Sequence, residues 1–157
     1  MRNERRLVFI YVLTLIGSLI WLAAIMLAPW LSSRSSGLSP FLYACFAPIC
    51  HQIPSRSFEL CGFPMAVCAR CLGIYVGFLA GMVLYPIRRD FAGGRLPKTS
   101  LFLTVSAPIV LDAAANVLRL WDTPNLLRFF FGFLWGLILP FYFLTGLGEL
   151  ALQVRKK

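Results

Sequence analysis

The residues with the clearest chemistry lie between Cys50 and Cys71, a stretch that holds four of the five cysteines and the only histidine of this 157-residue chain. Cysteine thiolates bind metal ions and attack disulfides, and a neutral imidazole is a common metal ligand. Cys50 and His51 together with the Cys68-x-x-Cys71 pair have the composition of a Cys3His site, for which zinc is the typical ion. The sequence therefore predicts a metal site with Cys50, His51, Cys68 and Cys71 as ligands.

The same residues support two alternative hypotheses. Adjacent ligands such as Cys50 and His51 point apart unless the backbone kinks, so His51 can instead be an acid or base. In a thiol-disulfide oxidoreductase, one thiol of the Cys-x-x-Cys pair would attack and Cys50 would resolve the mixed disulfide. The N-terminus of the helix whose first turns contain the pair, and Arg70 between the two cysteines, would stabilise the thiolate. In a structural role, disulfides that include Cys45 or Cys61 would staple the segment.

A second polar group interrupts an apolar segment further along the chain. Asp112, Asn116 and Arg119 are spaced i, i+4 and i+7, so they share one face of a helix. Charged groups inside a membrane are costly and should face the bundle interior, where they pair. Arg70 and Arg128 enter their helices from the same side of the membrane as Arg119. Three arginines therefore lie near one aspartate, Asp112. The excess positive charge would bind an anion such as a lipid phosphate, a carboxylate or a quinone oxygen.

These observations assign candidate roles. If the protein is an enzyme, the catalytic candidates are His51, Asp112, Asn116 and Arg119. The candidates for binding an anionic lipid-like ligand, or a quinone under the redox hypothesis, are Arg56, Arg70 and Arg128. The alternative for Asp112 is an ion pair that only locks two helices together.

The elements that position these residues are predicted to be membrane helices. With 59% hydrophobic and 13% charged residues, the chain is too apolar for a soluble domain. A span needs about 20 apolar residues. Four segments meet this length, namely residues 7–30, 65–87, 100–121 and 126–148. We expect an all-α, four-helix transmembrane bundle that forms one domain over residues 1–157, with the lipid bilayer as its partner and an outer loop over residues 31–64.

Basic residues predict the orientation of this bundle. The net charge of +9 comes from short clusters beside the apolar segments, not from one basic face, which argues against a nucleic acid partner. Cytoplasmic loops are enriched in Lys and Arg. With both termini cytoplasmic, ten basic residues face the cytoplasm and only Arg34 and Arg56 lie in outer loops. The sequence thus predicts a multi-pass protein of the inner (cytoplasmic) membrane with its Cys/His loop outside.

Glycine spacing predicts which helices pack most closely. Gly73, Gly77 and Gly81 recur at every fourth residue, which lets the backbones of membrane helices approach each other. Gly132 and Gly136 repeat the spacing in the fourth predicted helix. The helix that begins beside the cysteines is therefore expected to be central to the bundle.

The motifs resemble those of a domain-of-unknown-function family of small bacterial and archaeal integral membrane proteins. The resemblance rests on Cys50-His51-Gln52, on Arg56-Ser57-Phe58, on Cys68-Ala69-Arg70-Cys71-Leu72-Gly73-Ile74-Tyr75, and on Asp112, Asn116 and Arg119. It implies an integral membrane protein and carries no activity with it. Cys45 and Cys61 are not part of the pattern, which makes them poorer site candidates.

A looser resemblance is to the four-helix periplasmic thiol oxidases, which pass electrons from a Cys-x-x-Cys at a helix N-terminus to quinone. In those enzymes the second cysteine pair lies in the other outer loop. Here that loop is residues 122–125, which contain no cysteine. A thiol shuttle in this chain would have to use Cys50 or Cys61.

Overall fold

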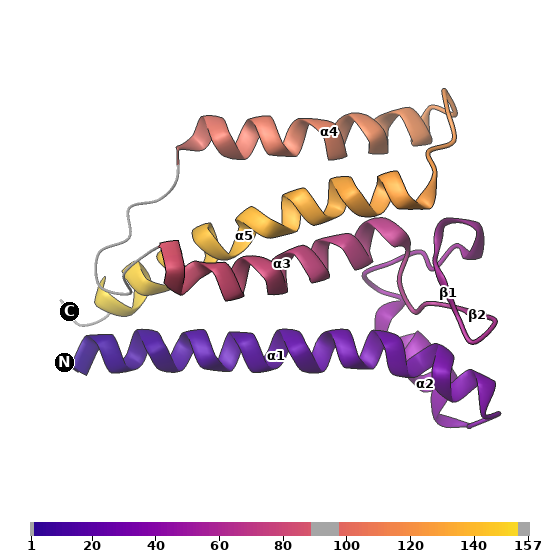
Figure 1. Cartoon of the computed structure of the whole chain (residues 1–157), viewed down its shortest axis with the longest axis horizontal. Helices are drawn as coiled ribbons and strands as arrows, with labels where there is room; N and C mark the ends of the chain where they lie inside the picture. The colour runs from indigo at the N-terminus through magenta and orange to yellow at the C-terminus, as the bar shows by residue number, and fades with distance from the viewer. Residues whose placement is uncertain (1, 89–97, 154–157) are drawn as a thin grey trace.

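Four long helices lie side by side in the computed structural model, which describes residues 2–88 and 98–153 (Figure 1). They are α1 (Arg2–Ser33), α3 (Ala69–Arg88), α4 (Thr99–Val117) and α5 (Asn125–Gln153). Each contains a stretch long and apolar enough to cross a membrane, which confirms the expected four-helix architecture. Their order across the molecule is α1, α3, α5, α4, so α4 lies outside α5 (Figure 1).

The start of α1 and the end of α5 lie at one end of the bundle, and the segment that connects α1 to α3 lies at the other (Figure 1). We call the latter the cysteine end. An even number of spans requires this arrangement. The basic connection at residues 89–97 and the basic tail at residues 154–157, on which the predicted orientation partly depends, lie outside the described residues.

The connecting segment is more structured than the predicted loop. It contains the helix α2 (Leu38–Phe46), a single 3-10 turn (Pro54–Arg56) and an antiparallel hairpin of β1 (Glu59–Leu60) and β2 (Phe63–Pro64). The hairpin turns through Cys61 and Gly62, whose φ angles are 54° and 79°. Two consecutive positive φ values define the tight turn that matches the twist of two paired strands.

α1 and α5 extend beyond the predicted spans, whereas α3 and α4 are each shorter than predicted at the cysteine end. α3 begins at Ala69 and not at residue 65, because Pro64 belongs to β2 and residues 65–68 form a loop. α4 ends at Val117 and not at residue 121. There Arg119 adopts a φ of 56°, and its N–H donates to the Asn116 carbonyl while the Leu120 N–H donates to the Ala115 carbonyl. This pair of hydrogen bonds is the Schellman termination of a helix.

The α3–α5 contact is the closest in the bundle, as the glycine spacing predicts. The two helices run parallel, and a Cβ added at Gly77 would collide with the carbonyl oxygen of Phe133. A Cβ at Gly136 would collide in turn with the carbonyl oxygen of Ile74. Glycine is required here because any side chain would push the two backbones apart.

By contrast, α1 packs on α3 in two separate places. At the cysteine end, Ile25 and Ala28 of α1 join a buried cluster with Phe46, Cys50 and Leu72. At the opposite end, a second cluster forms around Met82, Tyr85 and Leu144, and the Tyr11 hydroxyl donates a 3.0 Å hydrogen bond to the Met82 carbonyl. The first cluster fixes the segment that carries Cys50 against the start of α3.

Candidate functional site

Three cysteines meet at the start of α3. The sulfur atoms of Cys50, Cys68 and Cys71 all lie within 4.8 Å of one another, and we call them the cysteine triad. Cys50 follows α2, Cys68 immediately precedes α3, and Cys71 lies in its first turn. Zinc-bound sulfurs, each about 2.3 Å from the ion, lie roughly 3.8 Å apart in a tetrahedral site. The spacing of the triad is therefore near that of sulfur atoms bound to one metal ion.

The triad favours a thiolate at Cys50. Hydrogen bonds from the thiols of Cys68 and Cys71, assisted by the Cys68 backbone N–H at 3.1 Å, lower the pKa of the Cys50 thiol to about 2. The pKa of the Cys68 thiol is raised, chiefly because that thiol donates to Cys50. Only 6% of Cys50 is exposed. The site thus combines one stabilised thiolate with two neighbouring thiols, which suits metal binding and thiol exchange alike.

Gln52 positions the triad, a role that the sequence analysis missed. Its side-chain amide donates hydrogen bonds of 2.8 Å to the carbonyls of Tyr43 and Ala66, which joins the end of α2 to the segment before α3. The Tyr43 hydroxyl reinforces this junction by donating to the Pro64 carbonyl. Gln52 adopts a φ of 51°, in the left-handed region of the backbone. Gln52 belongs to the Cys-His-Gln motif, which could have indicated that this residue has a role. The motif alone does not indicate that its amide bonds to the carbonyls of Tyr43 and Ala66.

His51 does not join the triad. Its side chain is exposed, and the group of clustered ligands holds only the three cysteines. The predicted Cys3His set is therefore not assembled here, because adjacent side chains point apart and Cys50 is the one turned inward. Cys45 and Cys61 are exposed and lie outside the triad. All five cysteines belong to the described residues, and all five are free thiols.

A buried polar network lies beside the triad, between α3 and α4. The Asp112 carboxylate, only 1% exposed, forms an ion pair with Arg70 and accepts a hydrogen bond from the Thr123 hydroxyl. Asn116 donates to the Asp112 carboxylate at 3.2 Å and to Thr123 at 2.9 Å. The predicted pairing of Asp112 with an arginine and its shared face with Asn116 are confirmed, and Thr123 is a further member that the sequence analysis missed.

Arg128 extends the network onto α5. It is only 3% exposed and donates hydrogen bonds to Asn116 at 2.8 Å, to Asn125 at 3.0 Å and to Asp122 at 2.6 Å. The Asn125 amide in turn donates to the Ser57 carbonyl at 3.2 Å. The segment that carries Arg56 is thereby attached to the start of α5.

Arg119 is not part of this network. The prediction placed it on the helix face of Asp112 and Asn116, but α4 has already ended at Val117. Arg119 is exposed. The Schellman turn moves it off that face, and Thr123 contacts Asp112 from the connection to α5 instead.

The triad and the arginines line one pocket of about 330 Å³, which we call the arginine pocket. Its functional lining consists of the cysteine triad, His51, Arg56, Arg70, Asn116 and Arg128. Among the described residues, the carboxylates paired with these arginines are Asp112 on Arg70 and the exposed Asp122 on Arg128. The Nε atoms of Arg70 and Arg128 are buried without an acceptor in the described part of the chain. Three arginines and two paired carboxylates leave an excess of positive charge at this pocket, which favours an anion.

A family of membrane proteins shares this region. The family model described as "Predicted membrane protein (DUF2085)" matches residues 50–142, a range that begins at Cys50 and includes every residue of the arginine pocket except Ile49. The chain belongs to this family. It is thus a membrane protein, and the resemblance drawn from its cysteine motifs is confirmed.

Two relatives of this DUF2085 protein are uncharacterized proteins of archaea. Protein MJ1492 of Methanocaldococcus jannaschii is 38% identical over 140 residues, covering 85% of this chain and 90% of that protein. A protein of Methanothermobacter thermautotrophicus is 31% identical over 87 residues, covering 54% of this chain and 74% of that protein. No solved structure matches the chain.

Proposed function

We propose that this protein binds a metal ion, with zinc as the leading candidate, through Cys50, Cys68 and Cys71 at the outer face of the inner membrane. One observation supports the proposal above all. Three sulfurs from separate positions in the chain converge within 4.8 Å and line the same pocket as three arginines. Metal sites with three protein ligands keep a position for water or substrate, where a bound zinc ion supplies Lewis acidity.

The residues around the triad would handle an anionic, lipid-like ligand. Arg56, Arg70 and Arg128 would hold the anion through their guanidinium groups. His51, on the exposed side of the pocket, is available to exchange a proton with the ligand. Asp112 is not among the pocket-lining residues, so its role would be to hold Arg70 in position.

Metal analysis of the purified full-length protein tests this proposal. We expect about one zinc ion per chain and loss of the metal in Cys68→Ser. Cys61→Ser is the matched control, because Cys61 is exposed and outside the triad. Protein that contains no metal, or equal loss of metal in both variants, would overturn the proposal.

Thiol-disulfide exchange is the second candidate, favoured by the lowered pKa of the Cys50 thiol beside two further thiols. Two thiols of the triad would form one disulfide and pass two electrons and two protons to a quinone, which becomes the quinol. Counting free thiols before and after incubation with a short-chain quinone tests this idea. Two thiols lost per chain would support it, and five thiols retained would exclude it.

A further inference from the structure

We infer that the ligand of the arginine pocket is an anionic amphiphile whose hydrocarbon chain lies in a second, apolar pocket between α1 and α3. The inference rests on the anion pocket of the proposed function, since the charged head would lie there. It adds a binding site for the hydrocarbon chain of the ligand and the residues that would select for a ligand with such a chain.

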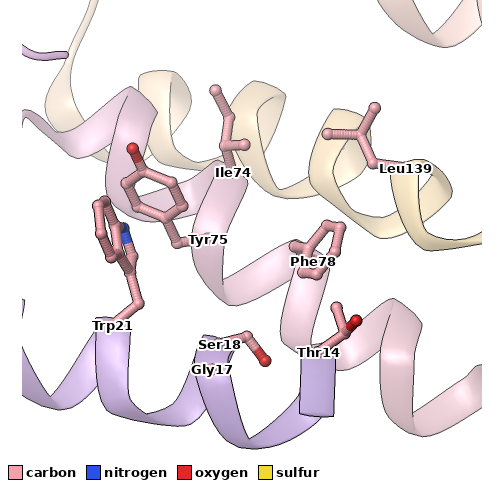
Figure 2. A pocket seen from close by; sticks show the side chains of 8 residues that line it. All are labelled: Thr14, Gly17, Ser18, Trp21, Ile74, Tyr75, Phe78 and Leu139. Atoms are coloured by element: carbon pink, nitrogen blue, oxygen red, sulfur yellow. The ribbon is translucent and has the colours of Figure 1, made fainter. Parts of the chain in front are cut away.

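The apolar pocket has a volume of about 420 Å³ and lies between the two places where α1 packs on α3 (Figure 2). Its main lining residues are Gly17, Trp21, Ile74, Tyr75, Phe78 and Leu139. Ligand sites typically enclose about 300–1,000 Å³. The pocket is therefore large enough for part of an alkyl or isoprenoid chain.

The two aliphatic hydroxyls in this lining, of Thr14 and Ser18, are already hydrogen-bonded. The Thr14 hydroxyl donates to the Ile10 carbonyl at 2.8 Å, and the Ser18 hydroxyl donates to the Leu15 carbonyl at 2.8 Å. Both bonds stay within α1 and leave an apolar surface toward the pocket. A hydrocarbon chain therefore leaves these two hydrogen bonds intact, whereas a polar ligand would lose its own hydrogen bonds to water on this largely apolar surface.

The two pockets share no lining residue, but both reach one face of α3. Cys71, Ile74, Tyr75 and Phe78 have the spacing i, i+3, i+4 and i+7, so they form one stripe. At 1.5 Å per residue, the apolar part of the stripe lies roughly 5–10 Å deeper than Cys71. Tyr75 packs against the cluster that contains Cys50 and also lines the apolar pocket, where its ring stands beside Trp21 (Figure 2).

This arrangement fits an amphiphile better than other occupants. A protein helix about 10 Å wide is too broad for the space between two helices that already touch at both ends. A free soluble anion would use the arginines and leave the apolar pocket without a role. A molecule with a charged head at the membrane surface and a chain directed inward matches the order of the two pockets along α3.

Binding measurements on the full-length protein in bilayer discs test the inference, with dodecyl phosphate, inorganic phosphate and dodecanol as probes and empty discs as the blank. Gly17→Leu fills the apolar pocket, because a Cβ at Gly17 meets no atom within 4 Å. We expect this variant to weaken dodecyl phosphate binding about tenfold, the effect of excluding two buried methylene groups. Its affinity for inorganic phosphate and its metal content should not change.

Two further variants complete the design. Gly146→Leu is the matched control, since Gly146 also has open space around it and lies outside the pocket. It should bind all probes like the original protein. Arg56→Gln should weaken both phosphate probes, because Arg56 lines the head pocket. Arg56 forms no ion pair among the described residues, so its replacement removes a phosphate-binding charge without breaking an ion pair of the fold.

Each outcome separates the inference from the proposed function. Equal affinity for dodecyl phosphate and inorganic phosphate, or no effect of Gly17→Leu, would overturn the chain site and leave the metal proposal intact. Dodecanol binding as tightly as dodecyl phosphate would identify an ordinary lipid contact and would also overturn it. Chain-dependent phosphate binding in protein without metal would support the inference and refute the metal site.

Discussion

Gln52 holds together the segments that carry the proposed cysteine ligands. Its amide joins the end of α2 to the segment before α3 through two carbonyls, so the position of Cys50 relative to Cys68 depends on it. Replacing a residue that orients metal ligands commonly costs about 10–100-fold in metal affinity. The exposed neighbour His51 has no comparable structural role.

We therefore expect Gln52→Ala to lower zinc affinity by about 10–100-fold with all cysteines intact. His51→Ala should retain one metal ion per chain, because His51 is outside the triad. Competition with a zinc-binding dye measures both affinities. Loss of metal from the His51 variant would show that the imidazole swings in as a fourth ligand.

The Arg70–Asp112 ion pair gives a second prediction at this scale. Asp112→Ala leaves Arg70, whose side chain is only 23% exposed, without its carboxylate. Breaking such a pair should lower the free energy of unfolding by about 3–5 kcal/mol. Replacing both residues, with Arg70→Met and Asp112→Leu, should restore much of the stability, since no charge is then buried alone.

Denaturation in detergent and phosphate binding together check this prediction. The double variant should be stable yet bind phosphate weakly, because Arg70 lines the arginine pocket. Full phosphate affinity in the double variant would mean that Arg70 serves structure alone.

At the scale of elements, the α3–α5 interface depends on glycine. Gly77→Ala should destabilise the protein by about 1–3 kcal/mol, the usual cost of an overpacked contact, because the new methyl group meets the Phe133 carbonyl. Thermal unfolding followed by circular dichroism measures the change. Gly146→Ala should be neutral or slightly stabilising, since its methyl group meets open space. Equal behaviour of the two variants would contradict the close contact.

The sequence predicts this interface well and the ends of some elements poorly, for physical reasons. Four-residue glycine spacing is a local pattern with a direct consequence for packing, so the sequence alone predicts the α3–α5 interface. The end of α4 cannot be predicted in this way, because Arg119 occupies the left-handed position where glycine or asparagine usually marks the end of a helix. The hairpin has strands of two residues, too short for an alternating pattern.

The site shows the same division. Cys50, Cys68 and Cys71 could be chosen from residue type and spacing alone, as could Asp112 with Asn116. The roles of Gln52 and Thr123 could not, because their partners are distant in the chain and become neighbours only in the folded protein. Residue type predicts His51 as a ligand, whereas in the structure its side chain is exposed and outside the triad.

At the scale of the whole molecule, the distribution of basic residues predicts that the cysteine end faces outward. Exposed Cys61 should then react with a membrane-impermeant maleimide on intact cells. Ser100, exposed near the start of α4 at the other end, provides the comparison. In a background with Cys45→Ser and Cys61→Ser, Ser100→Cys should be labelled only after permeabilisation. The reverse pattern would place the cysteine end in the cytoplasm.

The order of the helices also governs how the protein is made. The closest interface joins α3 to α5, yet α4 is synthesised between them and ends up outside the pair (Figure 1). Chains emerge from the ribosome N-terminus first. Until α5 follows, the glycine face of α3 therefore meets lipid, which cannot replace the missing backbone contacts. The contacts of α3 and of Arg70 with α5 can therefore form only after α5, the last helix, has been synthesised.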